Sequence, residues 1–451
     1  MKRTLAAVTV AFVFCNLLIQ NASYVNADEW PQWRGPNRDG TWSEEGIIEK
    51  FEYLELEILW RSPVASGYSG PTVADKKVFV TDRIKTDNIY SERVLCFDAM
   101  NGKGLWTHTY HAKYKNIGYP SGPRASVTID GKCTYSLGTM GHLFCLNTEN
   151  GSVIWQKDLN SEYDIKMPLW GITAAPLVEE NLLIVQAGGK SGACIVALDK
   201  SNGEEIWRAV DDEASYSAPI IIEHLGKRVL LCWTARYLNG LNPANGNVYF
   251  QYDYKPGDMG QNISTPVFCD GYVFMSSFFF GSAVVRLLPD KSEVEEIWRR
   301  KGENERNTDS LHCCISTPIL TNEYIYGVDS YGELRCLELL TGDRVWEDLT
   351  AVPKARWANI HMVRNGDKIW MFNERGELII SKLSPYGFQE ISRAKLIDPT
   401  EDQLDQRGGV CWSHPAFAYK HVYARNGKEL VCASLAAEER KSKSELKKKG
   451  D

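Results

Sequence analysis

Short runs that alternate apolar and polar residues recur along most of the chain, and they predict β-strands rather than helices. One unit shows the pattern clearly: after Pro318, two apolar runs lie within residues 324–337, and a Gly-x-x-x-Trp motif closes at Trp346. Turn residues separate the runs, as at Asn150-Gly151, a dipeptide typical of tight hairpins because both positions need positive φ. We expect each unit to form four short antiparallel strands, which is one blade of a β-propeller.

The closing aromatic residue of the unit repeats with a period of 43–52 residues. Its positions are Trp60, Trp106, Trp155, Trp207, Phe250, Trp298 and Trp346, and Ile391 takes an eighth slot. A large indole at six of these eight positions predicts a structural role, in which each tryptophan packs against the neighbouring blade.

The order of the units predicts how the ring closes. Trp60 precedes the first proline of the repeat, Pro71, whereas the last unit, 413–435, ends without its own Gly-x-x-x-Trp strand. We therefore expect residues 54–60 to complete the last blade, which removes two exposed sheet edges. The predicted fold is all-β, an eight-bladed propeller of four-stranded blades. A seven-bladed ring is the alternative, because the unit over 357–391 lacks both the proline and the tryptophan.

The ends of the chain read as separate segments. Lys2 and Arg3 precede an apolar run and a small-residue site ending at Ala27, the order of a secretory signal peptide, although an uncleaved membrane anchor is the alternative. The expected organisation is a signal over 1–27, a lead-in over 28–53, the propeller over 54–435 and a charged disordered tail over 436–451. This order predicts an exported protein of the periplasm, the cell envelope or the medium.

Charge and cysteine content narrow the range of partners. The 451 residues carry a formal net charge of −7, which argues against binding to nucleic acid or to an anionic membrane surface and allows peripheral membrane association at most.

Four of the 12 cysteines occupy one strand position of the repeat, and we expect them to be small buried hydrophobic residues; they are Cys96, Cys145, Cys336 and Cys432.

The repeat resembles the PQQ-like (pyrroloquinoline quinone repeat) β-propeller family. The resemblance rests on the Gly-x-x-x-Trp turn, on strand ends such as Ala197-Leu198-Asp199, and on the lead-in motif from Trp30 to Gly40. The family implies two functions: quinoprotein alcohol dehydrogenases bind pyrroloquinoline quinone and calcium, whereas scaffolds similar to the BamB-type outer-membrane assembly factors are not enzymes. The fold does not choose between them.

The adjacent Cys313-Cys314 has the composition of the vicinal disulfide found in the dehydrogenases. That pair lies early in those enzymes, and neither their calcium ligands nor their catalytic aspartate has a match in this sequence. We therefore expect a non-catalytic binding or scaffold protein of the cell envelope, without a cofactor, acting as a monomer on envelope or secreted proteins. The alternative is a quinoprotein oxidoreductase with quinone and calcium. Whether the two cysteines form a disulfide stays open.

Residues near the proline of each unit are predicted to line one channel mouth, because positions two apart on a strand share a face. The candidate ligand-binding residues are Tyr68, Arg124, Tyr216, Trp357, Asn359, His361, Trp412 and His414. Aromatic walls with a few polar groups suit a small molecule, a carbohydrate or a peptide segment. His312, His361 and His414 come from consecutive units, so a metal-dependent enzyme is a further hypothesis. We favour singly hydrogen-bonded histidines and predict no metal site.

Overall fold

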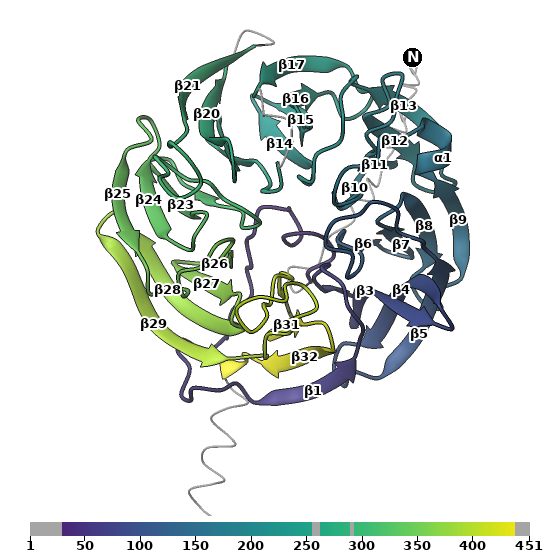
Figure 1. Cartoon of the computed structure of the whole chain (residues 1–451), viewed down its shortest axis with the longest axis horizontal. Coiled ribbons are helices and arrows are strands. Elements are labelled where there is room, and N and C mark those ends of the chain that lie inside the picture. The colour runs from purple at the N-terminus through teal and green to yellow at the C-terminus, as the bar shows by residue number, and fades with distance from the viewer. Residues whose placement is uncertain (1–28, 255–261, 289–292, 438–451) are drawn as a thin grey trace, which may run out of the picture.

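The computed structural model describes residues 29–254, 262–288 and 293–437, which form a ring of eight four-stranded antiparallel sheets (Figure 1). We number the sheets as blades 1 to 8 in chain order. Blades 1 to 7 each use four consecutive strands, from the innermost to the outermost, and blade 8 combines both ends of the propeller. The predicted eight-bladed fold is confirmed, and the seven-bladed alternative is wrong.

The strands of blades 1 to 4 are β2 (Thr72–Ala74), β3 (Lys77–Thr86), β4 (Ile89–Asp98), β5 (Gly104–His111); β6 (Thr128–Asp130), β7 (Cys133–Leu137), β8 (His142–Asn147), β9 (Val153–Asp158); β10 (Leu177–Glu179), β11 (Leu182–Gln186), β12 (Ile195–Asp199), β13 (Glu205–Ala209); and β14 (Ile220–His224), β15 (Lys227–Trp233), β16 (Tyr237–Leu241), β17 (Val248–Asp253). A single short helix among the described residues, α1 (Leu159–Tyr163), follows β9 and is capped by the Asp158 carboxylate.

The strands of blades 5 to 8 are β18 (Val267–Cys269), β19 (Tyr272–Ser277), β20 (Gly281–Leu287), β21 (Val294–Arg300); β22 (Ile319–Leu320), β23 (Tyr324–Val328), β24 (Leu334–Glu338), β25 (Arg344–Asp348); β26 (Ile360–Asn365), β27 (Lys368–Asn373), β28 (Glu377–Ser384), β29 (Gly387–Lys395); and β30 (Ala416–Ala418), β31 (His421–Arg425), β32 (Glu429–Ser434) with β1 (Ile58–Pro63). In the described part of the chain, no helix has the length and apolar character needed to cross a membrane.

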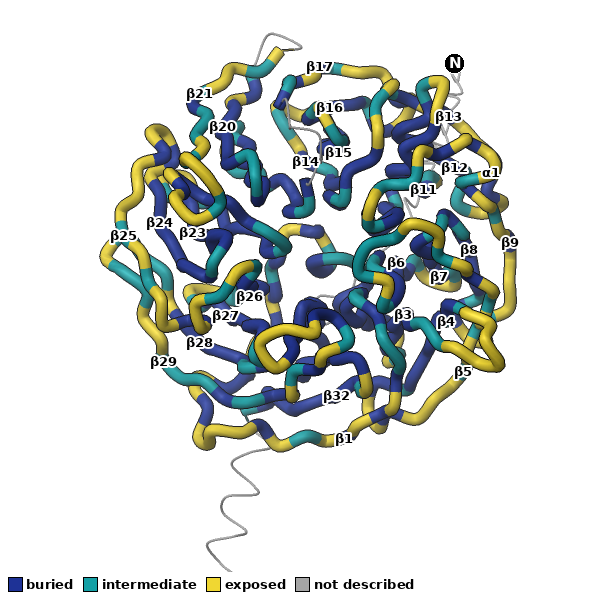
Figure 2. The backbone as a smooth tube through the Cα atoms, in the orientation of Figure 1, coloured by how far each residue is buried: buried dark blue, intermediate teal, exposed yellow. Residues whose placement is uncertain are grey.

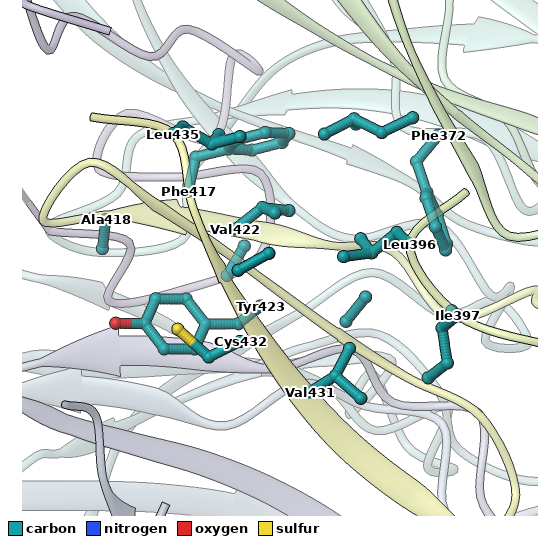
Figure 3. Close-up of a cluster of buried hydrophobic side chains, with 14 of the residues drawn as sticks. Phe372, Leu396, Ile397, Phe417, Ala418, Val422, Tyr423, Val431, Cys432 and Leu435 are labelled. Atoms are coloured by element: carbon teal, nitrogen blue, oxygen red, sulfur yellow. The ribbon is translucent and has the colours of Figure 1, made fainter. Parts of the chain in front are cut away.

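The ring is closed by β1, which pairs antiparallel with β32 as the sequence predicts. Trp60 lies opposite Cys432 and Arg61 lies opposite Val431. Figure 3 shows the core of this blade, in which Tyr423, Val431 and Cys432 pack among buried aliphatic and aromatic side chains. The two ends of the propeller therefore share one sheet, and neither the first nor the last blade leaves its sheet unfinished.

The predicted structural role of the repeated tryptophans is confirmed at six positions. Each indole Nε1–H donates to a main-chain carbonyl oxygen of the next blade, at 2.7–3.1 Å. The donor and acceptor pairs are Trp60 and Ala99, Trp106 and Thr148, Trp155 and Lys200, Trp207 and Pro243, Trp298 and Leu339, and Trp346 and Ser384. Each indole thus links two blades through both its apolar rings and its polar edge.

The glycine of the following turn makes room for the indole. Gly203 has φ of +78°, and a Cβ added there would lie 2.8 Å from the ring of Trp155. The same close approach recurs at four more turns: Gly102 on Trp60, Gly151 on Trp106, Gly246 on Trp207 and Gly342 on Trp298. The Gly-x-x-x-Trp motif therefore joins blades in series, since its glycine receives the indole of the preceding blade and its tryptophan enters the next turn.

Each outermost strand has a shift in register beside its aromatic position. In blade 2, Cys145 lies opposite Trp155 and Leu146 lies opposite Val153, so that Ile154 is an extra residue. Its side chain is 47% exposed, whereas that of Trp155 is buried. In most blades the bulge thus turns an aliphatic side chain outward in front of the aromatic residue, whereas in blade 4 the extra residue is Tyr249. Exposed residues follow the outer rim in Figure 2.

The assignment of Ile391 to the eighth aromatic slot is wrong. In blade 7, Ser392 lies opposite Ile380, and Ile391 is the extra residue of the bulge. The Ser392 hydroxyl oxygen accepts a hydrogen bond from the Phe51 main-chain N–H at 2.9 Å. Phe51 is buried in the same core and its ring lies 6.0 Å from that of Trp370. The lead-in therefore supplies an aromatic side chain to the blade that lacks the repeated tryptophan.

The four repeated cysteines are buried as predicted, and each lies opposite the aromatic residue of its blade. All 11 cysteines of the described residues have free thiols, including Cys313 and Cys314. The predicted signal over 1–27 and all but the first two residues of the predicted tail over 436–451 lie outside the described residues.

The substitution Trp155→Ala is expected to lower the free energy of unfolding by about 3–5 kcal/mol, because it opens a cavity between two blades and removes one of the two donors to the Lys200 carbonyl, the other being the Tyr135 hydroxyl. The adjacent Ile154→Ala is the matched control and should change it by no more than about 0.5 kcal/mol. Urea unfolding compares them. Equal effects of the two substitutions would contradict the role given to the indole.

A second pair of variants isolates the glycine contact. Gly203 and Gly226 both have positive φ, but a Cβ at Gly226 would meet nothing within 4 Å. Gly226→Ala should therefore cost only the backbone strain, about 1 kcal/mol, and Gly203→Ala should cost about 1–3 kcal/mol more. Thermal and urea unfolding of the two variants give the difference, and a difference near zero would mean that the turn does not hold the indole.

Candidate functional site

The segments that lead into the innermost strands bring the predicted mouth residues together around the axis of the ring. Seven of the eight line one cavity of about 350 Å³; they are Tyr68, Arg124, Tyr216, Trp357, His361, Trp412 and His414. Asn359 does not line it. The Asn359 side chain is buried, and its Oδ1 accepts a hydrogen bond from the Ser316 hydroxyl of the neighbouring blade. The strand period thus located the cavity but not the direction of every polar side chain.

The lead-in segment closes one end of the channel, where it passes through the centre of the ring (Figure 1). Trp33 lines the cavity, and its Nε1–H donates to the Thr265 hydroxyl of blade 5 at 2.9 Å. On the opposite side the indole meets the His414 ring edge to face, with centroids 4.6 Å apart. Trp33 therefore forms a floor that spans the channel from blade 5 to blade 8.

A buried arginine fastens this floor. The Arg38 guanidinium donates to the main-chain carbonyl oxygens of Ala175 at 3.1 Å and Pro219 at 3.0 Å, and also to that of Pro176. Burial lowers the pKa of Arg38 to about 9, so it stays charged at neutral pH. These carbonyls lie at the start of blades 3 and 4, so Arg38 anchors the lead-in on that side of the ring. A second anchor lies at blade 7, where the Trp42 main-chain N–H donates to the Arg364 main-chain carbonyl.

Tyr119 spans the other end of the cavity. It lies on the loop between blades 1 and 2, with φ of +52°. Its ring centroid is 6.3–6.5 Å from those of three tryptophans that come from loops of other blades: Trp170, Trp357 and Trp412. These four rings form an aromatic rim over the cavity. The rim joins loops from both sides of the ring, since Trp170 precedes blade 3 and Trp412 precedes blade 8.

Arg124 holds the loop that carries Tyr119. Its Nη1 donates to the Gly122 carbonyl at 2.7 Å, and its Nη2 donates to the carbonyls of Gly118, at 2.8 Å, and of Tyr119. The guanidinium carbon lies 4.9 Å from the centre of the Tyr68 ring, within the range of a cation–π contact. Burial lowers the pKa of Arg124. The loop is therefore bound to a cation that also faces the cavity.

The two histidines of the cavity are neutral. His414 Nδ1 lies 3.1 Å from the Pro415 carbonyl, and its Nε2 lies 2.7 Å from the Ser126 hydroxyl, so Nδ1 donates and Nε2 accepts. His361 Nε2 lies 2.8 Å from the Trp412 carbonyl and donates to it. Burial lowers the pKa of His361 to about 4 and that of His414 to about 3. Both side chains are thus committed to the protein as neutral groups.

The hypothesis of a metal site built on three histidines has no support among the described residues, where no group of three metal-ligating side chains gathers. His312 lies apart from the other two: its Nδ1 is 2.9 Å from the Phe278 carbonyl, and its main-chain N–H donates to the Asp329 carboxylate. Each of the three histidines is hydrogen-bonded to the protein, and His312 and His414 use both ring nitrogens.

The described lining also does not fit the quinone and calcium of the dehydrogenases. Pyrroloquinoline quinone is a tricarboxylate, which needs several cationic partners, and calcium needs several oxygen ligands. Among the described residues that line the cavity, Arg124 is the one arginine or lysine, and none is Asp, Glu or Asn. Cys314 does line the cavity, as the vicinal pair of the dehydrogenases would, but its thiol is free.

Several lining residues carry no signal in the repeat. Trp33 comes from the lead-in, Tyr119 and Trp170 come from loops of unequal length, and Phe278 and Phe279 follow β19. The resemblance of the lead-in to exported family members identified this segment in the sequence, but it did not predict that the segment lies inside the channel. The strand period indicated Trp357 and Trp412, and an aromatic residue four to six positions before the proline slot is the one feature that could have indicated Tyr119 and Trp170.

Acidification is expected to destabilise the fold in a window set by the cavity histidines. Their folded pKa values lie below the value of about 6.5 for an unfolded histidine, so unfolding takes up protons and stability falls as the pH drops below 6.5. Between pH 6.5 and 5 the loss should reach about 2 kcal/mol for each of His361 and His414. Urea unfolding at several pH values measures it. His414→Gln should reduce the loss, exposed His111→Asn should not, and a flat profile would show that the histidines are not held neutral.

The fold and the sequence are similar to known proteins. The outer membrane protein assembly factor BamB of Yersinia pestis is 20% identical over 234 residues, 48% of this chain and 54% of that protein, so the chain spans about half the length of this relative. The crystal structure of BamB from Moraxella catarrhalis is 16% identical, with a TM-score of 0.53 over 83% of this chain and 98% of that one. Quinohemoprotein alcohol dehydrogenase from Comamonas testosteroni is 11% identical, with a TM-score of 0.64 over 92% of this chain and 82% of that one.

At these identities the likeness to the solved structures is one of fold. The family model described as outer membrane protein assembly factor BamB matches residues 90–348. That match covers more than half of the 451 residues, and the chain therefore belongs to this family of PQQ-like β-propellers.

Proposed function

We propose that this chain is an exported, non-catalytic binding protein of the cell envelope, monomeric and at most peripheral to the membrane, that engages partner polypeptides. Membership of the BamB family supports a role in the envelope. The observation that carries the non-catalytic part is the commitment of three titratable side chains of the cavity, His361, His414 and Tyr68, to the protein itself.

A general acid or base must reach the substrate and needs a pKa near the working pH. His361 and His414 meet neither need, because both are bonded to the protein and burial lowers their pKa values to about 4 and about 3. The Tyr68 hydroxyl donates to the Gln403 carbonyl at 3.2 Å, and burial raises its pKa. These groups support a rigid surface better than they support proton transfer.

The loops around the aromatic rim are the favoured surface for a partner. The outermost strands are exposed edges, but the bulge in each one interrupts the row of main-chain groups that an added strand would pair with. Leu169, beside Trp170 on the rim, is 51% exposed and lines the cavity mouth. Exposed apolar side chains held on rigid loops are typical of binding surfaces.

Site-specific photo-crosslinking tests this proposal in cells that make the protein. A photoreactive residue at Leu169 should give a discrete crosslinked product with an envelope protein. Leu105, which is 44% exposed on the outer rim, is a control matched in residue type and exposure and should give none. Crosslinked products from Leu105 alone would mean that the partner binds at the outer strand edges. Products from neither position would contradict the proposal of a polypeptide partner.

The oxidoreductase alternative has its own test. Purified protein incubated with pyrroloquinoline quinone and Ca²⁺ should show neither the absorbance of a bound quinone, nor a rise in the unfolding temperature, nor dye-linked oxidation of primary alcohols. Tight binding together with alcohol oxidation would replace the proposed function by that of a quinoprotein dehydrogenase.

A further inference from the structure

Arg124 is a partly buried cation without an acidic partner. Its guanidinium lines the axial cavity, and its hydrogen bonds go to three main-chain carbonyl oxygens, those of Gly118, Tyr119 and Gly122. Within the described chain it takes part in no ion pair. Neutral carbonyls compensate a partly buried charge only in part, so a carboxylate brought into the cavity would gain more from this group than from an arginine fully exposed to water.

The guanidinium keeps capacity for a ligand. It has five N–H donors, and the three bonds to carbonyls leave two of them. The acid whose charge acts on it, Glu92, is itself bound by the hydroxyls of Tyr110, at 2.5 Å, and of Tyr114. Glu92 is therefore committed elsewhere and does not neutralise the cavity.

The remainder of the lining is mostly aromatic and aliphatic. Trp33 forms the floor, Trp170 and Tyr216 lie together with ring centroids 4.8 Å apart, and Tyr119 crosses the rim. The histidines are neutral, as argued above. A volume of about 350 Å³ lies at the lower end of the range for small-molecule sites, large enough for a fused two-ring system. Aromatic faces select planar, apolar bodies.

We infer that the axial cavity binds a planar aromatic ligand with a single carboxylate, whose acid group pairs with Arg124 and whose ring lies among the aromatic side chains above Trp33. Two sources share this chemistry: a free aromatic acid, and a polypeptide that ends in an aromatic residue. One carboxylate matches the one cation that the described lining offers. The inference does not rest on the proposed envelope partner, because it concerns the purified protein alone.

Calorimetry with matched ligands tests the acid group without altering the protein. The probes are 2-naphthoate and its uncharged isostere 2-naphthamide, together with a short peptide ending in phenylalanine as the free acid and as the amide. Charge-assisted hydrogen bonds predict that the carboxylate binds about 10-fold to 100-fold more tightly than the amide. Selectivity for naphthoate alone identifies a free acid as the source, and the same selectivity for the peptide identifies a chain terminus; both support the inference.

Two arginine variants assign that selectivity to one residue. Arg124→Gln should abolish the preference for the carboxylate. Arg83 holds the same loop through the Pro120 carbonyl, at 2.7 Å, but does not line the cavity, so Arg83→Gln is the matched control and should keep the preference. If Arg124→Gln fails to fold, the comparison of acid and amide in the unaltered protein still tests whether the cavity prefers a carboxylate.

Three results would overturn the inference: equal affinity for acid and amide in the unaltered protein, no heat of binding with either pair of ligands, or loss of selectivity in Arg83→Gln equal to that in Arg124→Gln. The last result would mean that the loop, rather than the guanidinium charge, sets the affinity.

Discussion

The contact between an indole of one blade and the glycine turn of the next is the interaction on which the rest of the structure depends. A blade is a small sheet that cannot bury both of its faces alone, so its stability comes from its neighbours. The indole fills the space between two blades, and its N–H satisfies a carbonyl in the following turn. Since Trp60 of blade 8 meets Ala99 and Gly102 of blade 1, the same contact also joins the end of the ring to its start.

A closed ring leaves an axial channel, and this chain fills that channel from both ends. Trp33 and Arg38 of the lead-in close one side, and the aromatic rim around Tyr119 narrows the other. The lead-in is held by a hydroxyl and main-chain carbonyls that lie just before the innermost strands of blades 3, 4 and 5. The Tyr119 loop is held by Arg124, which binds three main-chain carbonyls of that loop. The cavity is therefore a consequence of ring closure, and its chemistry is set by the few side chains that point to the axis.

Periodic features of the fold could be predicted from the sequence, and features without a period could not. The spacing of the tryptophans indicated the blades, and the strand period placed Tyr68, Tyr216, Trp357 and Trp412 around one cavity. The bulge next to each aromatic position shifts the alternation by one residue, which is why Ile391 was assigned the place of Ser392. Trp33 and Tyr119 were missed because a lead-in and a long loop follow the shape of the ring, which no local pattern encodes.

Closure of the ring by β1 is the central claim, and a disulfide across that strand pair measures it most directly. Pro63 lies opposite Glu429, and directly opposed residues of antiparallel strands have the Cα separation that a disulfide needs. In the double variant P63C/E429C, mild oxidation should link the two strands, identified by peptide mass spectrometry, and should raise the unfolding midpoint reversibly with respect to reductant. Thiols that stay unlinked, or a linked protein that unfolds like the reduced one, would contradict a ring closed by its first strand.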